Sequence, residues 1–225
     1  MDTQEDTQKR QPIFNAISPI IFCVIGLIAI TSIIGFWFTW FQDYLQFIPS
    51  DFSLEQSYRL ISYGFVHSDY MHLGFNALWL LIFASPIVQF FGGRSFLIIF
   101  ACGLIVGSAI FLTATNPVIV IGASAGVSAC IGAALRFMLR PAFDFYNRPL
   151  LYKLTDGRFL FPSVAFCLID IGQAFFMSTI GHNIAWQSHL IGFVVGAFLM
   201  EFNFINHHAL KRNKLTQSEE TYLGD

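Results

Sequence analysis

Several polar residues stand inside long apolar stretches of the sequence, where polar groups are costly and usually face the interior of a helical bundle, and four of them have side chains suited to one reaction. The four are Ser124, His189, His72 and Asn76. An imidazole that removes the proton of a serine hydroxyl turns the serine into a nucleophile, and histidine is mostly neutral, and so able to act as this base, at physiological pH. These residue types predict acyl transfer, with Ser124 as the nucleophile and His189 as the general base.

The attack of a serine on a carbonyl creates an oxyanion that needs hydrogen-bond donors. His72 and Asn76 are four residues apart, which places them on one face of a helix. Together with the backbone N–H of Ser124, they form the expected oxyanion hole. The four cysteines are spread over separate apolar stretches without metal-ligand spacing. We expect neither a metal ion nor a cofactor.

The small residues around Ser124 leave a second interpretation open. Gly122 and Gly126 flank it at a spacing of four residues, and Gly192 and Gly196 repeat this spacing later in the chain. Small residues at helical spacing let helices approach closely in a membrane, where lipid supplies no hydrophobic drive. Considered alone, Ser124 is more typical of helix packing than of catalysis. The other three polar groups favour the nucleophile because we expect them at the same depth.

The elements that must position these groups are membrane-spanning helices. Of the 225 residues, 55% are hydrophobic and only 12% are charged, which leaves too little polar surface to cover a soluble domain. Six apolar runs come close to the ~20 residues that cross the hydrocarbon core of a bilayer. They are 17–41, 71–91, 96–115, 118–139, 159–180 and 184–204. The sequence therefore predicts an all-α membrane protein built as a bundle of six transmembrane helices.

The helical rise places the polar groups at a common depth. Counted from one side of the membrane, His72 and Asn76 lie within ~12 Å of the start of the second run. Ser124 lies roughly 10 Å into the fourth run and His189 roughly 8 Å into the sixth. Asp170 lies deeper, about two-thirds of the way along the fifth run. We therefore expect Asp170 to be a structural polar contact rather than a third catalytic member, and the residue that orients His189 is left open.

The basic residues predict the orientation of the bundle, because Lys and Arg accumulate in short cytoplasmic loops. With both termini in the cytoplasm, every Lys and Arg except Arg59 lies on the inner side, and the polar groups lie near the outer face. The net charge of -2 and the scatter of the basic residues give no reason to expect nucleic acid as a partner.

The same pattern predicts the domain boundaries. We expect a cytoplasmic tail at 1–15, a membrane domain at 16–208 and a second cytoplasmic tail at 209–225. Within the membrane domain, 140–158 is an inner loop and 42–70 is a long outer loop. We expect His67 in the outer loop to be a loop or interfacial residue, and the alternative is that it assists the polar site. The aromatic residues available to anchor the outer loop in the membrane interface are Trp37, Trp40, Tyr44, Tyr58 and Tyr63.

Three short motifs resemble the rhomboid family of intramembrane serine proteases. They are "HLGFN" at 72–76, "GASAG" at 122–126 and "SHLIGFVVG" at 188–196, on the second, fourth and sixth predicted helices as in that family. The resemblance implies a dyad of Ser124 and His189, with His72, Asn76 and the Ser124 amide as the oxyanion hole. The chain departs from the family at Ser128, where many members have an aromatic residue that supports the histidine.

The resemblance also implies the biological setting. It predicts a protease in the bacterial inner membrane, with the lipid bilayer and single-span transmembrane proteins as its partners, and a fifth helix that gates substrate entry together with the loop near 181–185. Two other classes are weighed against it. One is an inactive relative that binds transmembrane helices, which would typically have lost the serine or the histidine. The other is a small transporter, which would favour charges at the midplane. The oligomeric state, the natural substrate and its cleavage position are left open.

Overall fold

A computed structural model describes residues 17–113, 118–138, 156–179 and 184–200 of the chain. Every regular element among these residues is a helix or a 3₁₀ turn. The described residues also contain one isolated β-bridge, between Phe47 and Val120. The all-helical prediction is therefore confirmed for the described part of the chain. The predicted tails, 1–15 and 209–225, most of the inner loop 140–158 and most of the loop near 181–185 lie outside it.

Each of the six apolar runs contains a helix. The long helices are α1 (Pro19–Trp37), α4 (Tyr70–Phe91), α5 (Gly93–Ala109) and α9 (Gly157–Thr179), and the shorter ones are α6 (Ser124–Met138) and α10 (Trp186–Leu199). The smaller elements are α2 (Thr39–Leu45), α3 (Arg59–Ser62) and the 3₁₀ turns Pro49–Asp51, Leu54–Gln56, Tyr63–Phe65 and Ile110–Thr113.

Four of these helical segments are long and apolar enough to cross a membrane, namely Pro19–Trp37, Tyr70–Phe91, Gly93–Thr113 and Gly157–Thr179. Helices α6 and α10 are apolar but have only 15 and 14 residues. The described residues thus show four full-length candidate spans rather than the six that hydropathy predicts. The difference in α6 has a local cause, because residues 118–123 belong to the apolar run but not to the helix.

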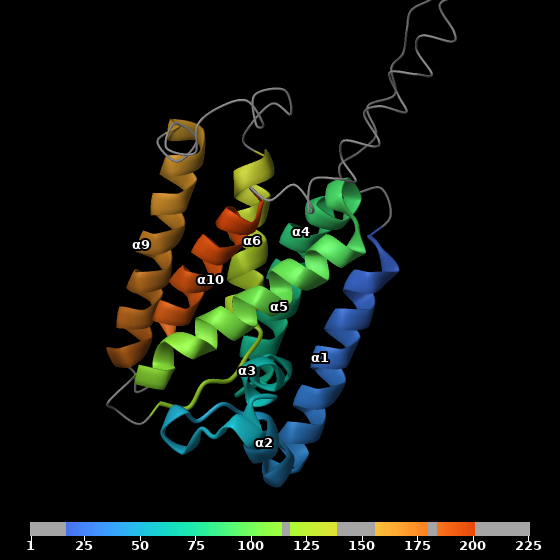
Figure 1. The fold of residues 1–225 in the computed structure, drawn as a ribbon, viewed down its shortest axis with the longest axis vertical. Coiled ribbons are helices and arrows are strands. Elements are labelled where there is room, and N and C mark those ends of the chain that lie inside the picture. Colours follow the sequence, from blue (N-terminus) through green and yellow to red (C-terminus); the bar gives the residue numbers. More distant parts are fainter. Residues whose placement is uncertain (1–16, 114–117, 139–155, 180–183, 201–225) are drawn as a thin grey trace, which may run out of the picture.

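The helices form one bundle with α6 and α10 in its middle (Figure 1). Helix α5 crosses this pair obliquely and contacts both, while α4 packs against α5 and α6. Helices α1 and α9 lie at opposite edges, and the elements between α1 and α4 gather at one end of the bundle. The site must therefore be assembled from the central helices and from whatever the loop at that end contributes.

The central pair is in contact through its backbone. A Cβ atom at Gly192 or Gly196 would overlap the carbonyl oxygen of Ala125 or Ala129 in α6. Gly126 faces α5 instead, because a Cβ at this position would lie 2.7 Å from the Phe100 ring of that helix. The contacts at Gly192 and Gly196 leave no room for a side chain, so α10 and α6 pack with their main chains in contact.

Candidate active site

A continuous chain of hydrogen bonds joins three helices in the bundle. His189 of α10 places Nε2 2.7 Å from the hydroxyl oxygen of Ser124 in α6. Its other ring nitrogen, Nδ1, lies 2.7 Å from Oδ1 of Asp170 in α9. The side chains of His189 and Asp170 are 15% and 10% exposed, so both bonds are largely shielded from solvent. Ser124 and His189, which the sequence pairs, are therefore brought into direct contact.

The depth assigned to Asp170 from the sequence is wrong. Asp170 lies in the half of α9 that ends at Thr179, close to where α10 begins, and its carboxylate reaches His189 directly. Asp170 lies only nine residues before Thr179 in a helix of 23 residues, which is less than half of the helix length from that end, whereas the sequence prediction puts it at two-thirds. The structure therefore places a carboxylate against the ring nitrogen of His189 that faces away from Ser124.

Ser124 is the first residue of α6, not a residue roughly 10 Å inside a helix. The preceding Gly122 has a φ of 104°, a backbone conformation that side chains with a Cβ rarely adopt. A Cβ at Gly122 would also lie 2.5 Å from Cε1 of His72. Gly122 therefore ends an extended segment and lets the helix start at Ser124, where the first backbone N–H groups have no partner inside the helix.

The loop between α1 and α4 holds the extended segment in place. Val120 exchanges two backbone hydrogen bonds with Phe47, of 2.9 and 3.1 Å, and the N–H of Gly122 donates to the carbonyl of Tyr63 at 2.9 Å. Tyr63 is fully buried, and its hydroxyl donates to the carbonyl of Leu104 at 2.9 Å. Its predicted role as an interfacial anchor is therefore wrong. Tyr63 fixes the loop to α5, and the loop fixes the residues before Ser124.

His67 is a third point of attachment, which agrees with the alternative that it assists the polar site rather than with a loop or interfacial residue. It is fully buried, and its Nε2 accepts a hydrogen bond of 3.2 Å from the N–H of Ala123, next to the candidate nucleophile. Because Nε2 accepts, the ring proton is on Nδ1, which lies 2.9 Å from the hydroxyl oxygen of Ser32 in α1. The sequence did carry a signal for His67, which is an ionisable residue among apolar ones. Nothing in the sequence indicated that Phe47 holds the segment before Ser124.

Burial lowers the pKa of His67 to about 3, an effect that a charge on nearby His72 strengthens and Asp69 opposes. The folded protein thus keeps His67 neutral, while the unfolded chain protonates it near 6.5. The His67 contribution to stability is full above pH 6.5 and is lost as the pH falls towards 3. Between pH 7.5 and pH 5 we expect the free energy of unfolding to fall by about 2 kcal/mol through this residue.

The measurement is thermal unfolding of the purified protein at several pH values, compared with the His67→Gln variant. Glutamine can accept from Ala123 and donate to Ser32, but it does not titrate. We expect the variant to lose much of the pH dependence while staying folded at neutral pH. The same decline in both proteins would show that other groups cause it.

His72 and Asn76 lie on α4, beside the segment that carries Ser124. The helix is capped by Asp69, whose Oδ1 accepts from the N–H of His72 at 2.8 Å, and Asn76 Nδ2 donates to the carbonyl of His72 at 2.8 Å. One N–H of the Asn76 amide is thereby used, and the amide carries a second. Helix α4 packs against α6, and His72 is close enough to His189 for the two rings to interact electrostatically.

Which ring nitrogen of His72 carries the proton depends on the hydroxyl group of Ser68. Ser68 Oγ lies 2.7 Å from Oδ2 of Asp69 and 3.2 Å from Nδ1 of His72, so its proton can point to either. When Ser68 donates to His72, the ring carries its own proton on Nε2, the nitrogen that lies nearer to Gly122. In that state His72 presents a donor towards the start of α6.

Two comparisons with known proteins bear on this site. A family model described as "Rhomboid domain" matches residues 54–205, a range that includes every residue of the hydrogen-bonded chain and of the His72 and Asn76 pair. The curated protein "Putative rhomboid protease YdcA" of Bacillus subtilis (strain 168) is 27% identical over 146 residues. This match covers 64% of the chain and 66% of that relative, so it spans slightly less than two thirds of the relative's length.

Proposed function

The chain belongs to the rhomboid family and is an integral membrane protein, and from that premise we propose that it is a serine protease that cleaves transmembrane proteins within the membrane. The observation that carries the proposal is the 2.7 Å separation between Ser124 Oγ and His189 Nε2. This is the distance a general base needs to take the proton of a nucleophile. A protein that only binds transmembrane helices would need no such contact.

The reaction follows from the positions of the protons. His189 takes the Ser124 proton as the hydroxyl oxygen attacks the scissile carbonyl, and the oxyanion accepts hydrogen bonds from the backbone N–H of Ser124, from Asn76 and from His72. His189 then gives the proton to the leaving amine, which leaves an acyl group on Ser124. Water attacks the acyl group while His189 takes one of its protons, and collapse of the second oxyanion returns the proton to Ser124 and releases the carboxylic acid.

The orientation of the bundle is part of the proposal. Both termini lie in the cytoplasm of a bacterial cell, and the site opens near the outer face of the inner membrane. In support, Trp37, at the end of α1, and Trp40 and Tyr44, in α2, are 76%, 66% and 57% exposed. Helix α2 lies at the end of the bundle where the loop between α1 and α4 gathers (Figure 1). Exposed aromatic residues of this kind collect at membrane interfaces. Substrates then reach Ser124 from the bilayer with the scissile bond near its outer boundary.

The test uses purified protein in liposomes with a transmembrane reporter and a fluorophosphonate probe that labels activated serines. We expect cleavage of the reporter and labelling at Ser124. The matched control is Ser128→Ala, because Ser128 is a buried serine one turn along the same helix, and this variant should keep both activities. An intact reporter, or labelling confined to another serine, would contradict the protease function and favour a protein that only binds transmembrane helices.

A further inference from the structure

We propose that Asp170 is a positioning residue that holds His189 in the tautomer required of a general base, so that the site is complete only when α9 is docked against α10. The inference rests on the proposed function, since it concerns the base of that reaction. It begins from a contact between two helices, the 2.7 Å separation of Asp170 Oδ1 and His189 Nδ1.

The chemistry of the carboxylate decides the tautomer. An ionised carboxylate can only accept hydrogen bonds, so the His189 proton must be on Nδ1. The lone pair is then on Nε2, which is the nitrogen that faces Ser124. Without an acceptor at Nδ1, the neutral ring can carry its proton on Nε2 instead, and that form cannot accept the Ser124 proton. The carboxylate also stabilises the positive charge that the ring acquires after proton transfer.

Burial argues against a packing role for Asp170. The residue is 8% exposed, and its second oxygen, Oδ2, is buried without a hydrogen-bond partner among the described residues. A charged group in this setting is costly, and an apolar side chain would fill the same space without the cost. The His189 contact is what the carboxylate supplies and an apolar residue could not.

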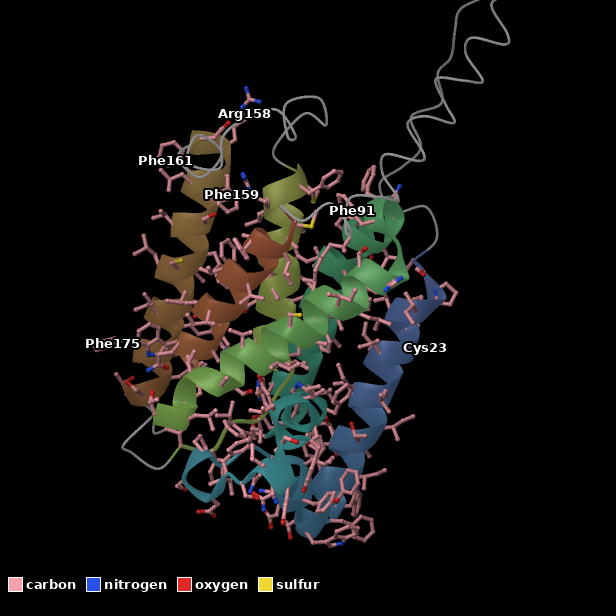
Figure 2. All side chains as sticks on the ribbon, in the orientation of Figure 1. Cys23, Phe91, Arg158, Phe159, Phe161 and Phe175 are labelled. Carbon is pink, nitrogen blue, oxygen red and sulfur yellow. The ribbon has the colours of Figure 1, made fainter. Side chains whose placement is uncertain are left out.

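The helix that carries Asp170 is attached along one narrow face. Its buried residues are Phe159, Asp170 and Ala174, and Phe166 on the same face stacks on Phe193 of α10 at a centroid distance of 4.8 Å. Figure 2 shows Phe161 and Phe175 on the side of α9 that points away from the other helices, where they are 76% and 73% exposed.

The rest of the α9 surface is mostly not covered by the other helices. In its most apolar stretch only 11% of the residues are buried, against 44% in the Gly93–Thr113 segment that contains α5. A small separation of α9 from α10 would break the bond between Asp170 and His189 and leave the Ser124–His189 pair, which spans the α6–α10 contact, in place. The docking of α9 thus controls the tautomer of the base without moving the nucleophile.

The experiment compares Asp170→Asn, Asp170→Glu and a control, Ser163→Ala, which removes a polar group two turns away on the same face of α9. If Asp170 positions His189, the Asn variant should lose kcat by roughly 10²- to 10⁴-fold with KM nearly unchanged, because the isosteric amide cannot fix the tautomer. The Glu variant, which is larger but keeps the carboxylate, should retain more activity than the Asn variant. Ser163→Ala should match the wild type.

The opposite order would overturn the positioning role. A packing residue predicts that the isosteric Asn variant is active and the bulkier Glu variant is not. The rate of fluorophosphonate labelling at Ser124 provides a second readout that does not depend on how a large substrate enters. We expect it to fall in Asp170→Asn by a factor similar to that for kcat.

Nitrogen NMR of histidine-labelled protein separates this inference from the proposed function, because it needs no turnover. The wild type should show a protonated Nδ1 and an unprotonated Nε2 at His189, and Asp170→Asn should show a mixture. An inactive wild type with this signature would overturn the protease function and support the role of Asp170 in orienting the ring. An active wild type whose His189 lacks the signature would overturn the positioning role alone.

Discussion

Replacing Ser124 or His189 by alanine is expected to lower kcat by roughly 10⁴- to 10⁶-fold, and replacing both is expected to lower it no further. In the proposed reaction the two side chains share one proton transfer across 2.7 Å, so removing either side chain already removes that step. The measurement is cleavage of the transmembrane reporter under single-turnover conditions by the two single variants and the double variant.

The double variant is the sharper part of this test. Independent contributions would multiply, and the double variant would then fall by the product of the two single effects, as long as the assay can resolve it. Thermal unfolding of Ser124→Ala should stay close to that of the wild type, because the serine is only partly buried. His189→Ala and the double variant should unfold at a somewhat lower temperature, because the buried carboxylate of Asp170 loses its hydrogen-bond partner. Loss of activity in a variant that has also unfolded would not support the dyad. Substantial activity in His189→Ala would exclude it.

The second large effect is expected at Gly192, where a single methyl group should separate the two central helices. A Cβ at this position would overlap the carbonyl oxygen of Ala125, the residue after Ser124. The clash lies between backbone and Cβ, so no rotamer change relieves it, and α10 must move by about 1 Å. A displacement of that size can cost roughly 10²-fold in rate. We therefore expect Gly192→Ala to lose activity and to unfold at a lower temperature.

Gly26 provides the matched control. It lies within α1, and a Cβ at Gly26 would meet nothing within 4 Å. Alanine in a helix is favoured over glycine, so Gly26→Ala should be neutral or slightly stabilising and should keep full activity. The prediction for Gly192 would fail if both alanine variants behaved alike, whether both were active or both were impaired.

Much of the architecture could be predicted from the sequence because it depends on local patterns. Apolar runs locate the six helical segments, and the spacing of Gly192 and Gly196 locates the face of α10 that meets α6. The residue types inside those runs identify Ser124 and His189, which the structure brings together. Each of these inferences needs only the composition and period of one segment.

The rest could not be predicted, because it depends on contacts between segments far apart in the chain. Hydropathy cannot tell an apolar extended segment from an apolar helix, so the start of α6 at Ser124 was missed. Gly122, which ends the extended segment, was read as a packing residue. The contact between Asp170 and His189 crosses two helices whose tilt no sequence pattern specifies, and the bond from Ala123 to buried His67 joins the loop to α6.

The backbone contact between α6 and α10 gives the two hydrogen bonds of His189 different sensitivities to the surrounding lipid. The bond to Ser124 spans helices whose main chains touch at Gly192 and Gly196, so its length cannot respond to a change in bilayer thickness without separating those main chains. The bond to Asp170 reaches a helix whose most apolar stretch is only 11% buried, and transmembrane helices tilt when the hydrocarbon core thickens or thins. If Asp170 positions His189 as proposed, we therefore expect a change in membrane thickness to alter the tautomer of the imidazole before it alters the contact between His189 and Ser124.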